Sequence, residues 1–238
     1  MKNKNAEQKA RKLAHKQRLK DAKKRRTAPA LTIPPPSRPE KQRFLIVCEG
    51  QNTEPDYFRA FRRNFKYANT EIIAIGGAGE TIRVVKQAQE QAAKEKYDQV
   101  WVVFDKDDFP AENFDNAIQM AKACGFFTAY SNQAFEYWLI LHFEDHQGGP
   151  MSREIYGDKL NGYLVPYKLT YDATGRKNIP SALFQVLLGN DPRTGVSRLS
   201  MAVERAESVF SFHQNTPPAA AESSTTVHLL VQELLKFV

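Results

Sequence analysis

The sequence predicts an α/β fold, with a mostly parallel four-stranded sheet flanked by helices and followed by a C-terminal helical annex. Residues 43–48 and 100–104 are apolar runs of the length of a buried strand, and each ends abruptly in acid. Between residues 44 and 130, strand-like and helix-like patterns alternate, and repeated βαβ units give parallel strands with right-handed crossovers. This rhythm stops after about residue 148, where the annex should begin.

The spacing of apolar residues locates each element in turn. Strands are expected at 44–48, 71–75, 99–104 and 126–130. Helices are expected at 56–65, at 81–96, and from a capping Asn113 or Asp115 to Cys124. Within the annex, helices are expected near 152–164, 181–188, 196–212 and 222–237.

Charge and proline content divide the chain into three parts: residues 1–40, 41–147 and 148–238. Residues 1–27 carry twelve Lys or Arg against Glu7 and Asp21, whereas residues 44–238 carry nineteen basic and twenty-four acidic residues. The basic tail has almost no apolar content, so it should be disordered or a lone solvated helix. Pro34, Pro35, Pro36 and Pro39 should make a stiff linker. Such a tail would be attracted to the phosphate backbone of a nucleic acid. The alternative is a solvated arm with no binding role.

Several classes of protein are excluded by what the sequence lacks. No apolar segment follows the basic tail as in a signal peptide, and no run of about eighteen apolar residues could span a membrane, so a cytoplasmic protein is expected. Cys48 and Cys124 are too few and too far apart for a disulfide framework or a zinc knuckle. No Walker sequence is present, so ATP hydrolysis would have to come from another subunit.

Acidic residues follow two of the predicted strands. Glu49 comes directly after the first strand, and Asp105 and Asp107 follow the third. Ligands bind beyond the carboxyl ends of parallel strands, and carboxylate oxygens are the ligands that Mg²⁺ prefers. The sequence therefore predicts a Mg²⁺ or Mn²⁺ site at Glu49, Asp105 and Asp107. The simpler alternative is that acids often follow strands because loops are exposed to solvent.

Three ordered segments carry a resemblance to known proteins. They are residues 44–58 (FLIVCEGQNTEPDYF), 103–109 (VFDKDDF) and 131–143 (SNQAFEYWLILHF). A Glu-Gly after the first strand and an Asp-x-Asp after a later one resemble the Toprim domain of topoisomerases, primases and nucleases. The three segments together resemble the RloB family, whose members often have Pro where this chain has Gln133.

The resemblance implies roles for single residues. It makes Glu49 the catalytic or metal-binding glutamate, Asp105 with Asp107 the metal pair, and Glu54 and Glu136 auxiliary acids. Lys168 resembles a Tyr-Lys or Tyr-x-Lys element and would contact a scissile phosphate, unless it is an ordinary surface lysine.

Three features have competing explanations from the residues themselves. Glu136 starts a strongly apolar helix, so it either needs a partner or a metal, or simply benefits from the helix dipole. His142 reads as a hydrogen-bonded core residue. The Gly76-Gly77-Ala78-Gly79 segment could cradle a phosphate, but a tight turn accounts for it better.

The resemblance and the acids together predict a metal-dependent nuclease that hydrolyses phosphodiesters of RNA, including transfer RNA, or of DNA. The family resemblance implies a role in antiphage defence or abortive infection beside a partner ATPase. The alternative is a non-catalytic adaptor of a defence complex that binds nucleic acid or the ATPase.

Overall fold

The structure, a computed structural model, describes residues 2–25, 42–65, 70–107, 110–146 and 149–238. The chain divides into two units, Met1–Pro39 and Glu40–Val238. In the first unit, the basic segment forms helix α1 (Lys2–Arg25). Of the two expected states, a disordered tail or a lone helix, the structure has the helix. The expected proline-rich linker and the expected start of the folded part at residue 41 lie outside the described residues.

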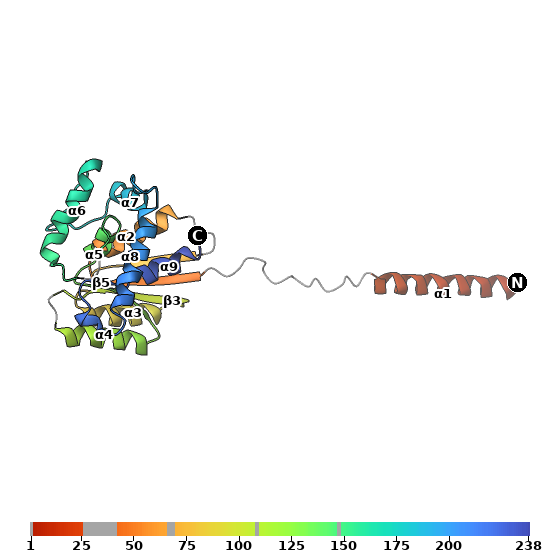
Figure 1. Cartoon of the computed structure of the whole chain (residues 1–238). Coiled ribbons are helices and arrows are strands. Elements are labelled where there is room, and N and C mark those ends of the chain that lie inside the picture. The colour runs from red at the N-terminus through yellow and green to blue at the C-terminus, as the bar shows by residue number, and fades with distance from the viewer. Residues whose placement is uncertain (1, 26–41, 66–69, 108–109, 147–148) are drawn as a thin grey trace. The chain divides into compact units, whose positions relative to one another are not determined.

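A five-stranded sheet forms the centre of the second unit, in the order β2-β1-β3-β4-β5 (Figure 1). The first four strands are parallel: β1 (Gln42–Cys48), β2 (Thr70–Ile75), β3 (Gln99–Asp105) and β4 (Phe127–Asn132). They confirm the mostly parallel sheet, and the helices between them are α2 (Thr53–Asn64), α3 (Thr81–Ala92) and α4 (Ala111–Ala123).

The predicted number of strands is wrong by one. The short strand β5 (Ser224–Thr225) pairs antiparallel with the end of β4, where the sequence pattern predicted the start of a helix. The Ser131 and Thr225 hydroxyl oxygens lie 3.0 Å apart across this pair. Helix α9 (Val227–Leu235) begins only after it.

A short helix α5 (Glu136–Leu141) follows β4. The annex then adds α6 (Tyr156–Leu164), α7 (Ser181–Leu188) and α8 (Arg198–Phe212) before β5 and α9. Single 3₁₀ turns, η1 (Arg153–Ile155), η2 (Val165–Tyr167) and η3 (Pro218–Ala220), complete it. Its apolar residues join the core on one face of the sheet, so residues 148–238 are not a separate compact unit.

Alternating residues of β1 point into two different cores, one on each face of the sheet, because successive side chains of a strand point to opposite faces. Phe44, Ile46 and Cys48 pack with helices α2, α5 and the annex. Leu45 and Val47 pack with α3 and α4 on the other face.

The helices that follow β1 and β3 therefore leave the sheet on opposite faces. Helix α2 after β1 contributes to one core, and α4 after β3 contributes to the other. Because β1 and β3 are neighbours, a crevice opens between their carboxyl ends, which is where ligands bind in open α/β sheets.

Within the described part of the chain, no helix has the length and apolar character that a bilayer span requires.

Candidate metal centre

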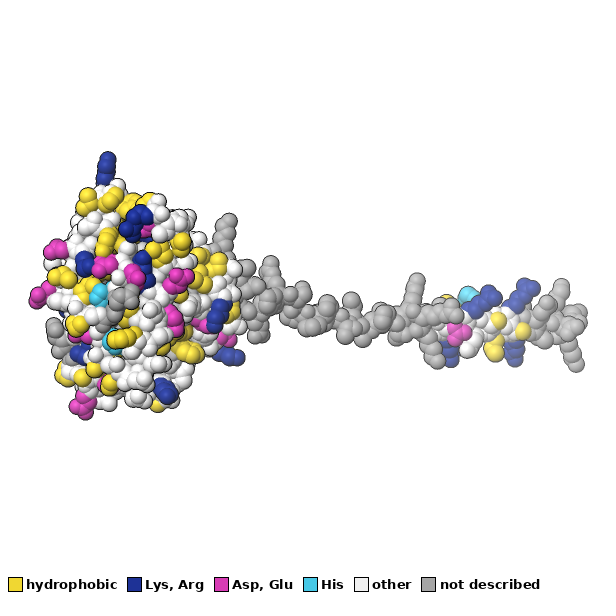
Figure 2. Space-filling view, viewed as in Figure 1, with side chains coloured by type: hydrophobic (Ala, Val, Ile, Leu, Met, Phe, Trp, Pro, Cys, Tyr) yellow, Lys and Arg dark blue, Asp and Glu magenta, His cyan; other side chains and the backbone are white. Residues whose placement is uncertain are grey.

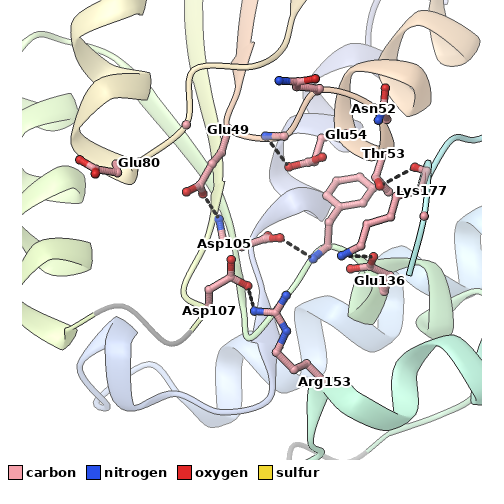
Figure 3. Close-up of a pocket in the computed structure, with 15 residues that line it drawn as sticks. Glu49, Asn52, Thr53, Glu54, Glu80, Asp105, Asp107, Glu136, Arg153 and Lys177 are labelled. Carbon is pink, nitrogen blue, oxygen red and sulfur yellow. Dashed lines mark hydrogen bonds and ion pairs between the residues drawn. The ribbon is translucent and has the colours of Figure 1, made fainter. Parts of the chain in front are cut away.

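A pocket of about 360 Å³ lies at the carboxyl ends of β1 and β3 (Figure 3). Its charged lining residues come from six separate segments of the chain. They are Glu49, Glu54, Glu80, Asp105, Asp107, Glu136, Arg153 and Lys177. Five of these acids were expected at the site from the sequence, and the fold brings all five to one pocket.

Glu49 and Asp105 are joined directly. The amide nitrogen of Glu49 donates to the Val103 carbonyl at 2.9 Å, which continues the pairing of β1 with β3 by one residue. The Glu49 carboxylate in turn accepts from the backbone amide of Asp105 at 3.0 Å. The acid after one strand is thus tied to the end of the neighbouring strand.

Asp105 has one satisfied oxygen and one orphaned oxygen. Its Oδ2 accepts from the backbone amide of Phe135 at 3.1 Å, whereas Oδ1 is buried and has no hydrogen-bond partner among the described residues. A buried carboxylate oxygen without a donor is costly, and a cation is one group that would satisfy it.

Asp107 is held on two sides. Its backbone has φ of 42°, and its amide donates to the Gln133 carbonyl at 3.0 Å. Its carboxylate forms an ion pair with the guanidinium of Arg153. Arg153 belongs to the 3₁₀ turn η1 of the annex, which no sequence pattern had connected with the site.

Glu54 lies beside the first acidic loop because Gly50 has no side chain. The Gly50 amide donates to Glu54 Oε1 at 3.2 Å, and a Cβ at residue 50 would lie 2.4 Å from Glu54 Oε2. Only glycine allows this close approach without moving the carboxylate.

The glycine segment at 76–79 braces the same loop. The amides of Gly77 and Gly79 donate to the carbonyls of Gly50 and Glu49, at 2.8 Å and 3.2 Å. A Cβ at Gly76 would lie 2.5 Å from the Gly50 carbonyl oxygen. The segment is therefore a turn packed against the Glu49-Gly50 backbone, with its amides used inside the protein.

Glu136 has the protein partners that one of its two explanations required, the buried Tyr171 and the partly exposed Lys177. Its Oε1 accepts from the Tyr171 hydroxyl at 2.8 Å and lies 3.7 Å from Lys177 Nζ. Thr53 contacts the Tyr171 hydroxyl at 3.1 Å and donates to the Lys177 carbonyl at 2.7 Å. This network joins helix α2 to the annex beside the pocket.

Three of the pocket acids, Glu49, Glu54 and Asp105, have raised pKa values. Burial is the main cause, and it raises the pKa of both Glu49 and Glu54 to about 7, with neighbouring carboxylates adding to the effect. Burial and the carboxylates around it raise the pKa of Asp105 well above its ordinary value. Acids that resist ionisation together would be stabilised by a bound cation.

Lys168 has the surface position that one of its two explanations expected. Lys168 is exposed and lies outside the lining of this pocket, at the left-handed residue that ends η2. The lysine that does line it is Lys177. His142 is buried with its Nδ1 3.0 Å from the Trp138 carbonyl oxygen, and burial lowers its pKa to about 3, so it is a neutral core residue.

The donor set fits a hard divalent cation, since Glu49, Asp105 and Asp107 offer only oxygen. As they stand, however, no group of three His, Cys, Asp or Glu side chains among the described residues is arranged to hold a metal ion. Glu49 is bonded to the Asp105 amide and Asp107 to Arg153. Side-chain rotation would have to accompany metal binding.

Comparison with known proteins places the chain in a family. No curated protein and no solved structure matches it. A family model described as RloB-like protein matches residues 44–234, which is most of the chain and covers both the pocket acids and the annex. The chain therefore belongs to the RloB-like family.

Proposed function

We propose that this chain is a metal-dependent nuclease that hydrolyses phosphodiester bonds of RNA or DNA. The observation that carries the proposal is the meeting of Glu49, Asp105 and Asp107 at the crevice between β1 and β3, with one buried Asp105 oxygen unpartnered. The resemblance of the first acidic segments to Toprim nucleases supports the same chemistry.

The residues that line the pocket would have different roles according to their positions. Glu49, Asp105 and Asp107 would hold Mg²⁺ or Mn²⁺ after side-chain rotation, with the backbone of Glu49 kept beside β3 by its bond to the Val103 carbonyl. The bound ion would polarise the phosphodiester, lower the pKa of a water and stabilise the leaving oxygen. Glu54 and Glu136 flank this set, and Glu136 holds Lys177 at the pocket wall, where its positive charge attracts a phosphate.

The proposed biological setting rests on the resemblance to RloB proteins. This resemblance supports a role in antiphage defence or abortive infection, with an ATPase partner controlling cleavage. Helix α1 would add affinity for the substrate backbone, since its described basic side chains are all exposed.

One observation favours a second candidate, a non-catalytic adaptor that binds nucleic acid or the ATPase. The Asp107 carboxylate is paired with Arg153, and the carboxylates are not arranged for a metal as they stand. A chain that had lost catalysis could keep such a pair as a purely structural contact.

Mapping of cleaved ends separates the two candidates. RNA and DNA are sequenced from cells that express the wild type, Glu49→Ala, or Glu90→Gln, which removes an exposed carboxylate from α3. The purified proteins are incubated with transfer RNA and single- and double-stranded DNA, in Mg²⁺, Mn²⁺ or EDTA. A nuclease gives new ends with the wild type and Glu90→Gln only, and only with metal. Equal cleavage by Glu49→Ala, or none by any protein, rejects the nuclease.

A further inference from the structure

Arg153 lies at the junction of two cavities. Beside the 360 Å³ pocket of the acids is a second cavity of about 770 Å³, and the two share Glu136, Arg153 and Lys177 in their linings. Two of these three shared residues are cations. A substrate that reached from one cavity into the other would therefore pass Arg153 and Lys177.

The backbone of Arg153 is fixed while its side chain can change partners. Its amide donates to the Gln133 side-chain oxygen at 2.8 Å, and the Gln133 carbonyl accepts from the amide of Asp107. Gln133 thus holds the two residues of the ion pair side by side. The side chains of Arg153 and Asp107 are 30% and 28% exposed, and ion pairs that water can reach are weak enough to exchange.

A divalent cation would compete with Arg153 for the same carboxylate. Asp107 Oδ1 already accepts from the Arg153 guanidinium (Figure 3). Two cations on one carboxylate repel each other. A guanidinium released from Asp107 stays at the junction because its backbone is held by Gln133. Its planar fork matches two oxygens of a phosphate group.

The far wall of the second cavity limits where that phosphate can sit. Beyond the junction the charged lining residues are acidic: Glu154, Asp158 and Asp172. These carboxylates repel a phosphate, whereas Arg153 and Lys177 attract one. The charge pattern favours a single phosphate at the junction, with an uncharged part of the ligand beyond it.

From this geometry we propose that the Arg153 side chain changes its binding partner when a metal ion binds. It holds Asp107 before metal binds, and it binds a phosphate group of the nucleic-acid substrate once a divalent cation takes Asp107. The inference rests on the proposed nuclease function and adds to it a phosphate subsite and a residue that competes with the metal.

Two affinities that should change in opposite directions test the proposal. Titration calorimetry measures the binding of Mn²⁺ alone, and then of thymidine 5′-monophosphate to Mn²⁺-saturated protein. Arg153→Gln should bind Mn²⁺ about threefold more tightly or better, because the competing ion pair is gone. The same variant should bind the nucleotide about tenfold more weakly or worse, because a charge-assisted hydrogen bond is lost. Arg153→Lys should recover part of the nucleotide affinity.

The control is Lys159→Gln. Lys159 is also in the annex, is 29% exposed and pairs with Glu144, but it lines neither cavity. It should match the wild type in both affinities, and thermal unfolding confirms that every variant is folded. Arg153→Gln with unchanged Mn²⁺ affinity or unchanged nucleotide affinity overturns this inference alone. Absence of Mn²⁺ binding by both the wild type and Arg153→Gln overturns the proposed function as well.

Discussion

The carboxylate of Glu49 accepts a hydrogen bond of 3.0 Å from the backbone amide of Asp105, although the two residues are 56 positions apart. The bond exists because β1 and β3 are adjacent parallel strands that end at the same edge of the sheet. It ties together the two acidic loops on which the proposed chemistry depends.

The first prediction concerns the cost of this arrangement without metal. Asp105→Asn should stabilise the metal-free protein at pH 8, since burial and the surrounding carboxylates raise the pKa of Asp105 and make its ionisation costly to the folded state. Asparagine keeps an oxygen for the Phe135 amide. The thermal midpoint in EDTA measures the effect.

Asp191→Asn provides the matched comparison. The backbone amides of Arg193 and Thr194 donate to Asp191 and lower its pKa, so loss of its charge should destabilise the protein. If both substitutions shift the midpoint in the same direction, the electrostatic account of Asp105 is wrong.

The second prediction concerns the glycine turn. Gly76→Ala should destabilise the protein by about 1–3 kcal/mol, because its Cβ would press on the Gly50 carbonyl and such overpacking has that typical cost. It should also weaken Mn²⁺ binding by moving the Glu49-Gly50 loop. Gly162→Ala in α6, whose Cβ meets nothing within 4 Å, should leave Mn²⁺ binding intact and should not destabilise the protein, since alanine favours a helix over glycine by about 0.5–1 kcal/mol. Denaturant titration and calorimetry provide the two measurements, and a neutral Gly76→Ala would show that the turn does not brace the loop.

The third prediction concerns pH. Because the pKa of Glu49 and of Glu54 is raised to about 7, protons compete with metal below that pH. The same shift means that ionisation between pH 4.5 and about 7 destabilises the metal-free fold, so stability from these groups is lost as pH rises. Mn²⁺ affinity should therefore increase from pH 6 to pH 8, by about tenfold for each carboxylate that must ionise. Affinity that is flat across this range would argue against Glu49 as a ligand.

The fourth prediction concerns α1. Lys9, Lys12, Lys16 and Lys20 recur every three or four residues and so share one face of the helix, while Arg11 and Arg18 lie on another. Figure 2 shows dark-blue side chains on more than one side of this helix. Changing the four lysines to Gln should lower the slope of log affinity against log salt for single-stranded nucleic acid by about 3, at about 0.7 for each phosphate contact.

The control variant loses the same charge from the second unit, Glu40–Val238. It has Gln in place of four exposed lysines, Lys86, Lys94, Lys96 and Lys122. Filter binding at several salt concentrations measures both slopes. Equal slopes for the two quadruple variants would remove α1 as a nucleic-acid contact.

The sequence predicted well what is encoded locally. The buried strands and their terminal acids were visible because apolar runs and strand ends leave short-range patterns, and parallel topology then places Glu49 near Asp105. The start of α2 was placed three residues late, at Asp56 in place of Thr53, because Pro55 was not recognised as a first-turn residue.

Features that depend on distant segments were missed. Strand β5 has two residues and exists only through pairing with β4. Arg153 and Lys177 reach the pocket from the annex, so no spacing near the acids could indicate them. For Lys168 a local motif suggested a phosphate contact, and the exposed position agrees with the alternative of a surface lysine.

The account depends most on cation binding by the three acids at the ends of β1 and β3. Titration calorimetry with Mn²⁺ on the wild type, Glu49→Gln, Asp107→Asn and the exposed-site control Glu90→Gln tests this directly. We predict binding to the wild type and to Glu90→Gln, and an affinity at least about tenfold lower for the other two variants, because each loses a charged ligand. No heat from the wild type, or undiminished affinity in Glu49→Gln and Asp107→Asn, would contradict it.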